Sequence, residues 1–304
     1  MYYPVLRGKL YEILALHELL DAGKLSTQIV PVIEPVRAST SFKKLLLALK
    51  EKKRTVAVIQ NSQLVEYSGL SDIQAIKAAT NFIPAYLLTD ENLADFQKMV
   101  GQDRIGIVEE ESDFTDTSVL EANQDWVAIN QRNRRAQRLF KNLNNVKAIE
   151  LNDDFTKLTR NADYLDTADE FFSDDHLHYL EDGFVGFGDY SIVGSDFARS
   201  GFAPRAVSIH IVYFAADDTL RIRHFTSNSN GDVRDPGGKY LEALDKLMTW
   251  VKSSEFDHAK NDSAALRDFE RMAREEVYSG LGVVKKLSIA HHLEIMGRYL
   301  EERA

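Results

Sequence analysis

The first half of the chain repeats one pattern of hydrophobic and polar positions. Short runs rich in Val, Ile and aromatic residues alternate with longer polar or amphipathic segments. This alternation is typical of βα units around a parallel sheet, and it predicts an α/β fold, a (β/α)8 TIM-like barrel that can be irregular. The predicted strands are residues 3–6, 29–34, 55–60, 82–88, 104–108, 126–129 and 146–151.

The pattern changes after residue 160. Residues 161–182 contain many Asp and Glu but no Lys or Arg, which is typical of an insertion that covers a surface or approaches something basic. Two hydrophobic runs then follow with a short polar connection, and they predict a β-hairpin at residues 206–227. His210 and His224 lie on opposite strands of this hairpin, where they can face each other as a structural or a catalytic pair. The eighth barrel strand is either 184–187 or 208–214.

These patterns predict the domain organisation. Residues 1–235 are expected to form the barrel, including the acidic insertion at 161–182 and the hairpin at 206–227. Residues 236–304 are expected to form a helical portion packed on the barrel. No run approaches the roughly 18 apolar residues of a membrane span. The N-terminus also lacks the pattern of a signal peptide, so we expect a cytoplasmic protein with no membrane partner.

Composition removes several function classes. The chain has no Cys, which excludes disulfides, thiolate catalysis and Cys-based zinc or iron–sulfur sites. A net charge of −10 argues against broad nucleic-acid binding, because such a surface needs dense Lys and Arg. The sequence also lacks GxSxG, GxxxxGK[ST] and a GxGxxG that follows a strand, which are the usual marks of α/β-hydrolases, P-loop NTPases and Rossmann enzymes.

Residues that follow the strands of such a barrel share one rim, where the chemistry of these folds takes place. Carboxylates beside several guanidinium groups can bind an anionic ligand and still provide a general base or a ligand for a divalent cation. The pattern identifies no particular cofactor. The alternative is that these side chains are polar because loops are exposed. The catalytic candidates are Glu34, Asp189 and Lys9, and the ligand-binding candidates are Arg7, Arg37, Asn61, Asn130, Arg132, Arg134, Arg135 and Tyr190.

One basic patch is concentrated in the run NQRNRRAQRLFK at residues 130–141. Its first arginines follow the sixth predicted strand and therefore fall on the same rim. If this loop opens a helix, the amides of the first helical turn favour a phosphate group there. The alternative is a solvated helix face that pairs with the acidic insertion.

Three segments resemble the beta-protein family of bacteria and phages. They are YPVLRGKLYEILAL, QIVPVIEPVR and GFGDYSIVG, and the resemblance covers mainly residues 1–61 and 183–225. The family has no established activity, so the resemblance supplies a context and no reaction. Ser191 stands in the turn where a glycine is expected. The resemblance implies a role in phage–host conflict and one shared site made of Lys9, Glu34, Asp189 and Tyr190.

Two functional hypotheses follow. In the first, the protein binds a small anionic, phosphate-containing ligand or nucleotide at the C-terminal rim of the barrel. If it is an enzyme, it is a hydrolase or phosphodiesterase that acts in phage–host conflict. In the second, it is a non-catalytic scaffold or a protein-binding component of a bacterial defence or phage-related system. The acidic segment and the C-terminal helices would then meet a protein partner.

Overall fold

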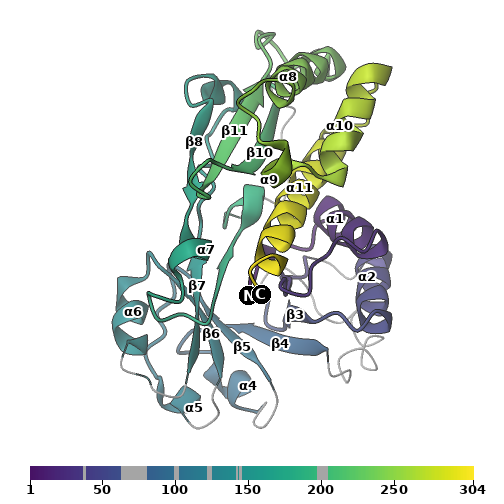
Figure 1. The fold of residues 1–304 in the computed structure, drawn as a ribbon. Coiled ribbons are helices and arrows are strands. Elements are labelled where there is room, and N and C mark those ends of the chain that lie inside the picture. Colours follow the sequence, from purple (N-terminus) through teal and green to yellow (C-terminus); the bar gives the residue numbers. More distant parts are fainter. Residues whose placement is uncertain are drawn as a thin grey trace. The chain divides into compact units, whose positions relative to one another are not determined.

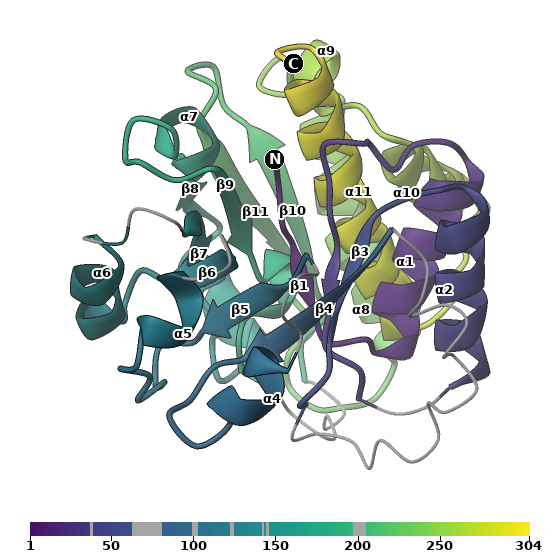
Figure 2. The ribbon, with the colours of Figure 1, turned by 90° about the horizontal axis from the view of Figure 1, so that it is seen from below.

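The computed structural model describes residues 1–36, 39–62, 81–98, 103–121, 125–141, 143, 146–196 and 205–304. The chain forms two compact units, which Figures 1 and 2 draw as ribbons. The first unit contains Met1–Ile13, Thr27–Asp153 and Asp175–Tyr190. The second contains Leu14–Ser26, Asp154–Asp174 and Ser191–Ala304.

The first unit is built on an eight-stranded parallel sheet, which confirms the predicted (β/α)8 TIM-like barrel. The strands follow one another in sequence order up to β7, which then pairs with β9. The strands are β1 (Val5–Leu6), β2 (Val32–Ile33), β3 (Val56–Ile59), β4 (Phe82–Leu87), β5 (Ile105–Val108), β6 (Trp126–Asn130), β7 (Lys147–Asn152) and β9 (Gly186–Asp189).

The barrel closes where β9 meets the N-terminal segment. Phe187 pairs in parallel with Tyr2, and the amide of Tyr3 donates to the carbonyl oxygen of Phe187 at 2.8 Å. A Cβ at Gly188 would lie 2.3 Å from the carbonyl oxygen of Tyr3, so the close approach of the two backbones requires glycine there. The eighth strand is therefore β9, and residues 208–214 belong to another sheet.

Hydrophobic side chains pack on both faces of the barrel strands. Ala128 faces the barrel interior, whereas the next residue, Ile129, faces the outer layer. Burial on both faces explains why these strands are nearly continuous hydrophobic runs in the sequence. The helices of this unit include α2 (Thr40–Glu51), α4 (Leu93–Gln97), α5 (Ser118–Glu121), α6 (Arg134–Phe140) and α7 (Asp175–His178). Figure 2 shows α4, α5 and α6 on the outside of the strands.

The second unit contains a three-stranded antiparallel sheet in the order β10-β11-β8. β10 (Ser208–Phe214) and β11 (Leu220–Thr226) pair along their full length, as the hairpin prediction required. β8 (Asp169–Ser173) lies within the acidic segment and was not predicted. The helical elements are η2 (Asn161–Leu165), η3 (Ser191–Val193), α8 (Pro236–Val251), α9 (His258–Asn261), α10 (Ala264–Glu275) and α11 (Leu281–Glu301), while α1 (Leu10–Asp21) belongs partly to each unit.

Side chains from the helices cover the outer edge of β10. The side-chain amide of Asn261 accepts a hydrogen bond from the Phe214 amide at 2.7 Å and donates to its carbonyl oxygen at 3.0 Å. His291 Nε2 lies 2.8 Å from the carbonyl oxygen of Val212. These bonds satisfy backbone groups that would otherwise be buried without partners. Among the described residues, no helix is both long and apolar enough to cross a membrane.

Candidate functional site

The rim at the carboxyl ends of the barrel strands carries most of the selected residues. Parallel strands bring these ends together, so residues that are far apart in the sequence become neighbours. Arg37 lies outside the described residues. The selected residues that end or directly follow a barrel strand are Arg7 after β1, Glu34 after β2, Asn61 after β3, Asn130 at the end of β6, and Asp189 and Tyr190 at the end of β9.

Arg7 and Glu34 form a buried ion pair at this rim, with side chains only 8% and 3% exposed. Arg7 Nη1 donates to Glu34 Oε2, and Ser62 Oγ donates to Glu34 Oε1 at 3.0 Å. Burial is the largest single effect on the pKa of Arg7 and lowers it, but the hydrogen bond to Glu34 and the charges of Glu34, Tyr190 and Glu109 together outweigh it, so the net pKa is raised. Arg7 is therefore a fixed positive charge held at the barrel mouth, the opening of the barrel at the carboxyl ends of its strands.

A glycine turn brings these two side chains together. Gly8 has φ +62°, and a Cβ at this position would lie 2.9 Å from the carbonyl oxygen of Glu34. The amide of Glu34 in turn donates to the carbonyl oxygen of Leu6 at 2.8 Å. The chain after β1 can therefore pass close to the end of β2 only with glycine at this turn.

Glu109 and Tyr190 also contact Arg7. Arg7 Nη2 lies 3.9 Å from Glu109 Oε1, and its guanidinium carbon lies 5.4 Å from the centre of the Tyr190 ring. The Glu109 side chain is 36% exposed. Burial raises the pKa of Glu109, Arg7 opposes this and Glu34 adds to it, so the net pKa is raised. Burial, followed by the charge of Glu109, raises the pKa of the Tyr190 phenol, which keeps it protonated.

Three other predicted residues also lie at the rim. Asp189 is 4% exposed and accepts a hydrogen bond from the Tyr2 hydroxyl at 2.8 Å. The Asn61 side chain donates to the carbonyl oxygen of Leu87 at 2.8 Å and accepts from its amide at 2.9 Å, which ties β3 to β4. Lys9 is half-buried at the turn before α1.

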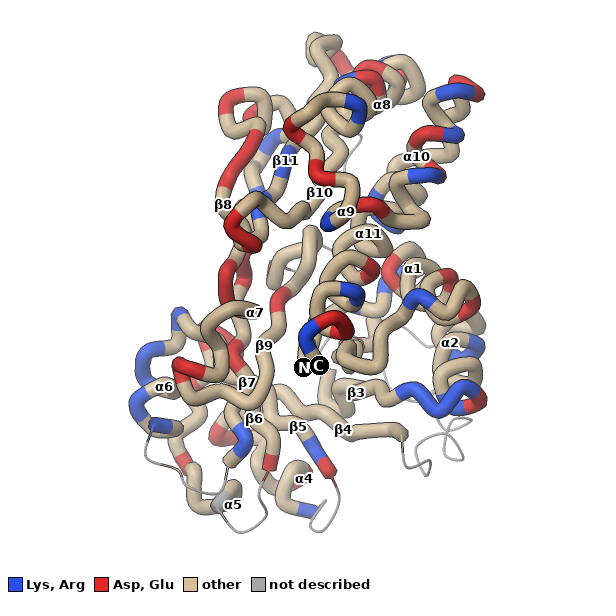
Figure 3. The backbone as a smooth tube through the Cα atoms, in the orientation of Figure 1, with Lys and Arg blue, Asp and Glu red and all other residues tan. Residues whose placement is uncertain are grey.

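The loop after β6 carries Arg132, Arg134 and Arg135, and this arginine loop lies beside the cluster around Arg7. Asn130 Oδ1 accepts a hydrogen bond from the Arg132 amide at 2.9 Å, and Arg132 Nη1 lies 3.7 Å from Glu110 Oε2. Arg134 and Arg135 begin α6 and are exposed, and Figure 3 shows the Lys and Arg positions on this helix. Glu109, the residue before Glu110, contacts Arg7. The two glutamates that follow β5 therefore connect the buried Arg7 to the exposed Arg132.

The sequence places Glu109 on the rim but assigns it no catalytic or ligand-binding role, and it does not select Ser62. Both lie just beyond barrel strands, so the rule that selected Glu34 also covers them. The sequence did not show which side chains at the strand ends face Arg7. That choice depends on the packing of loops from non-adjacent strands.

The two histidines of the hairpin face each other in the second unit, as predicted. His210 pairs with His224 across the strands, and their Nδ1 atoms lie 2.7 Å apart. His224 Nε2 lies 3.2 Å from Glu170 Oε1. Burial, followed by the nearby His224, lowers the pKa of His210 to about 3, so the pair shares one hydrogen bond between neutral rings. Within the described part of the chain, no three His, Asp or Glu side chains form a group suited to a metal ion.

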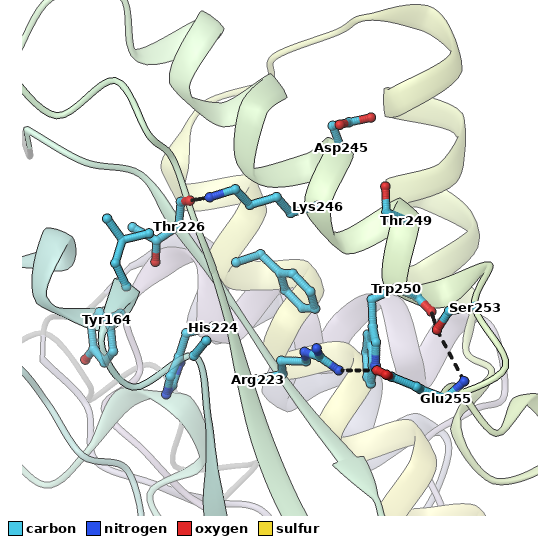
Figure 4. A pocket seen from close by; sticks show the side chains of 13 residues that line it. Tyr164, Arg223, His224, Thr226, Asp245, Lys246, Thr249, Trp250, Ser253 and Glu255 are labelled. Atoms are coloured by element: carbon cyan, nitrogen blue, oxygen red, sulfur yellow. Dashed lines mark hydrogen bonds and ion pairs between the residues drawn. The ribbon is translucent and has the colours of Figure 1, made fainter.

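The second unit also contains a cavity of about 560 Å³, lined by η2, β11 and α8 and shown in Figure 4. Its wall includes Arg223 and Lys246. Arg223 Nη1 lies 3.1 Å from Glu255 Oε2, and Lys246 Nζ donates to the carbonyl oxygen of Thr226 at 2.5 Å. Both cations therefore already bind groups of the cavity wall.

Ser191 occupies the position in the turn after β9 where a glycine is expected. Its φ is +49°, in the left-handed region that glycine adopts easily. Its Oγ lies 3.1 Å from His292 Nδ1, and both residues are buried. This hydrogen bond offsets the backbone strain that a residue with a Cβ experiences here.

We expect Ser191→Ala to lower the free energy of unfolding by about 1 kcal/mol more than Ser191→Gly does. Both variants lose the hydrogen bond to His292, but only alanine keeps the strained φ. Urea unfolding of the two variants measures the difference. Ser288, which lies within α11, is the control, because there glycine should cost about 1 kcal/mol more than alanine. The same order at both positions would contradict this explanation.

No family model, curated protein or solved structure matches this chain. The resemblance to the beta-protein family therefore stays a prediction. The functional argument depends on the geometry of the barrel mouth.

Proposed function

We propose that the barrel mouth binds a small anionic ligand that carries a phosphate group, such as a nucleotide, and that the protein works in the cytoplasm. The main support is Arg7, a guanidinium that the fold buries and holds with Glu34 at the end of β1. A cation fixed in advance loses little entropy when it binds an anion. Arg132, whose side chain is 60% exposed, adds a second guanidinium next to the acidic loop.

The proposal includes hydrolysis of the ligand, as in a hydrolase or phosphodiesterase. Glu34 and Asp189, the predicted catalytic carboxylates, are both buried and both accept hydrogen bonds from other side chains. In our proposal Glu34 therefore positions Arg7, and Asp189 anchors the N-terminal segment through Tyr2. Glu109 is left as the carboxylate near Arg7 that is exposed enough to reach a ligand.

The first test is a thermal-shift screen with pyrophosphate, ATP and glucose 6-phosphate, each with and without Mg²⁺. A ligand at about 100 times its Kd stabilises the native state by about 2.7 kcal/mol, which raises Tm by several degrees. The double variant Arg132→Ala/Arg134→Ala should lose most of this shift. Arg138→Ala is the matched control, because Arg138 is exposed in the last turn of the same helix. An equal shift in the double variant would remove the arginine loop from the site, and no shift in the wild type would overturn the proposal.

The alternative is a protein-binding component of a defence or phage-related system. One observation favours it: Phe171 on β8 is 53% exposed, on a strand at the edge of its sheet. A pull-down with wild-type protein and with Phe171→Ser separates the two proposals. A partner lost only in Phe171→Ser, together with no thermal shift, would favour the scaffold and the role in phage–host conflict that the resemblance implies.

A further inference from the structure

The two terminal nitrogens of Arg7 face two carboxylates in different environments. Nη1 bonds Glu34, whose side chain is 3% exposed and also accepts the Ser62 hydroxyl. Nη2 lies 3.9 Å from Glu109, whose side chain is 36% exposed. An anion that arrives from solvent can therefore approach Arg7 on the Glu109 side, because Glu34 and Ser62 occupy the other side.

An anion in that position lies close to the negative charge of Glu109. Two like charges held this close repel each other, and near a protein surface solvent screens the repulsion less than in bulk water. This repulsion is removed if Glu109 takes up a proton. The protein environment of Glu109 already favours this outcome, because burial and Glu34 raise its pKa against the opposing effect of Arg7.

The groups around Glu109 agree with this role. Glu34, after β2, disfavours the charged form of Glu109, whereas Arg7, after β1, favours it. Tyr190, after β9, faces Glu109 as a protonated phenol. On the side of α6, Asn133 Nδ2 donates to the backbone carbonyl oxygen of Glu109 at 3.0 Å and leaves the carboxylate available.

We propose that an anion binds Arg7 with uptake of one proton by Glu109, so that Glu109 makes the barrel mouth selective for anions in a pH-dependent manner. This inference rests on the proposed anion-binding function and adds its regulation. No covalent bond changes: the proton comes from solvent and returns when the anion leaves. Affinity therefore increases as pH falls, by up to about tenfold per pH unit while the free site is deprotonated and the occupied site is protonated.

Sulfate is a suitable probe because it keeps its double charge across neutral and mildly acidic pH, whereas phosphate titrates in this range. Calorimetry at constant ionic strength, in buffers of different ionisation enthalpy, counts the protons taken up on binding. We expect uptake approaching one proton in the wild type. In Glu109→Gln we expect uptake to fall by the same amount, with tighter sulfate binding at pH 7.5 and a nearly flat pH profile.

Glu110→Gln is the matched control, because this neighbouring carboxylate is 46% exposed and faces Arg132 in place of Arg7. It should keep the proton uptake of the wild type. A carboxyl NMR titration of wild-type protein gives a second measurement without any substitution, since sulfate should raise the pKa of Glu109.

Sulfate binding without proton uptake, or with the same uptake in Glu109→Gln, overturns this inference and leaves the anion site in place. If neither the wild type nor Glu109→Gln binds sulfate at any pH, the anion site itself fails, and this inference fails with it.

Discussion

Replacing Arg7 with methionine is expected to lower the free energy of unfolding by about 3 to 5 kcal/mol and to abolish anion binding. The substitution leaves Glu34 buried without its cation, because its side chain is only 3% exposed. It also removes the positive charge that favours the ionised form of Glu109. Two carboxylates then face each other at the barrel mouth without a cation between them. Urea unfolding measures the loss of stability, and sulfate calorimetry measures the loss of binding.

Glu34→Gln should cost less than Arg7→Met, because Arg7 still has Glu109 and Tyr190 nearby. The double variant Arg7→Met/Glu34→Gln should be more stable than Arg7→Met alone, since no buried charge is then left without a partner. This coupling is the signature of a buried pair. Arg271, which pairs with Asp268 on α10 and is 49% exposed, is the control, and Arg271→Met should cost under about 1 kcal/mol. A similar small cost for Arg7→Met would contradict the buried ion pair.

The barrel could be predicted because its strands carry their own local signal. Each of the first seven is a short apolar run buried on both faces, and such runs are visible without knowledge of the fold. The eighth strand has no such signal. β9 has the sequence GFGD, and its glycines are required by the close approach of Tyr3, which comes from the other end of the chain. Residues 208–214 have the stronger strand pattern, yet they pair in the second sheet.

The candidate site was only partly predictable for a related reason. The order of the strands determines which residues reach the rim, and this follows from the sequence once the barrel is recognised. Burial and pairing at the rim depend on contacts between distant loops. Glu34 and Glu109 both follow a strand, but one is enclosed by Arg7 and Ser62 and the other is partly exposed. The sequence therefore locates the acidic groups without separating the structural carboxylate from the one that can titrate.

β8 shows the same limit in the acidic segment. The acidic residues Asp169 and Glu170 led to the prediction of a surface insertion, so the strand β8 that begins at Asp169 was not predicted. In the structure Asp169 bonds Arg221 at 2.7 Å and Glu170 lies beside His224. The acidic side chains are thus partners of the neighbouring strand β11, which the sequence placed in the hairpin. A charged edge strand is recognisable only when its partner strand is known.

Lowering the pH from 7 to 5 is expected to destabilise the second unit by about 6 kcal/mol, about 2 kcal/mol for each of three buried histidines. Burial lowers the pKa of His210, His291 and His292 to about 3. Below the ordinary pKa of 6.5 the unfolded chain binds protons that the folded unit does not. Stability is therefore present above pH 6.5 and is lost progressively as the pH falls toward 3.

Trp250 reports on this unit, and Trp126→Phe removes the only other tryptophan, so fluorescence-detected urea unfolding follows the second unit alone. His292→Gln should reduce the pH slope between 6 and 5 by about 1.4 kcal/mol per pH unit. The exposed His258 is the control, because its bond to Asp262 raises its pKa. The raised pKa of His258 stabilises the folded unit below pH 6.5, and this stabilisation is lost as the pH rises through the folded pKa. His258→Gln should therefore not reduce the loss of stability between pH 7 and pH 5. An unchanged slope in His292→Gln would show that this ring binds its proton in the folded unit as readily as in the unfolded chain.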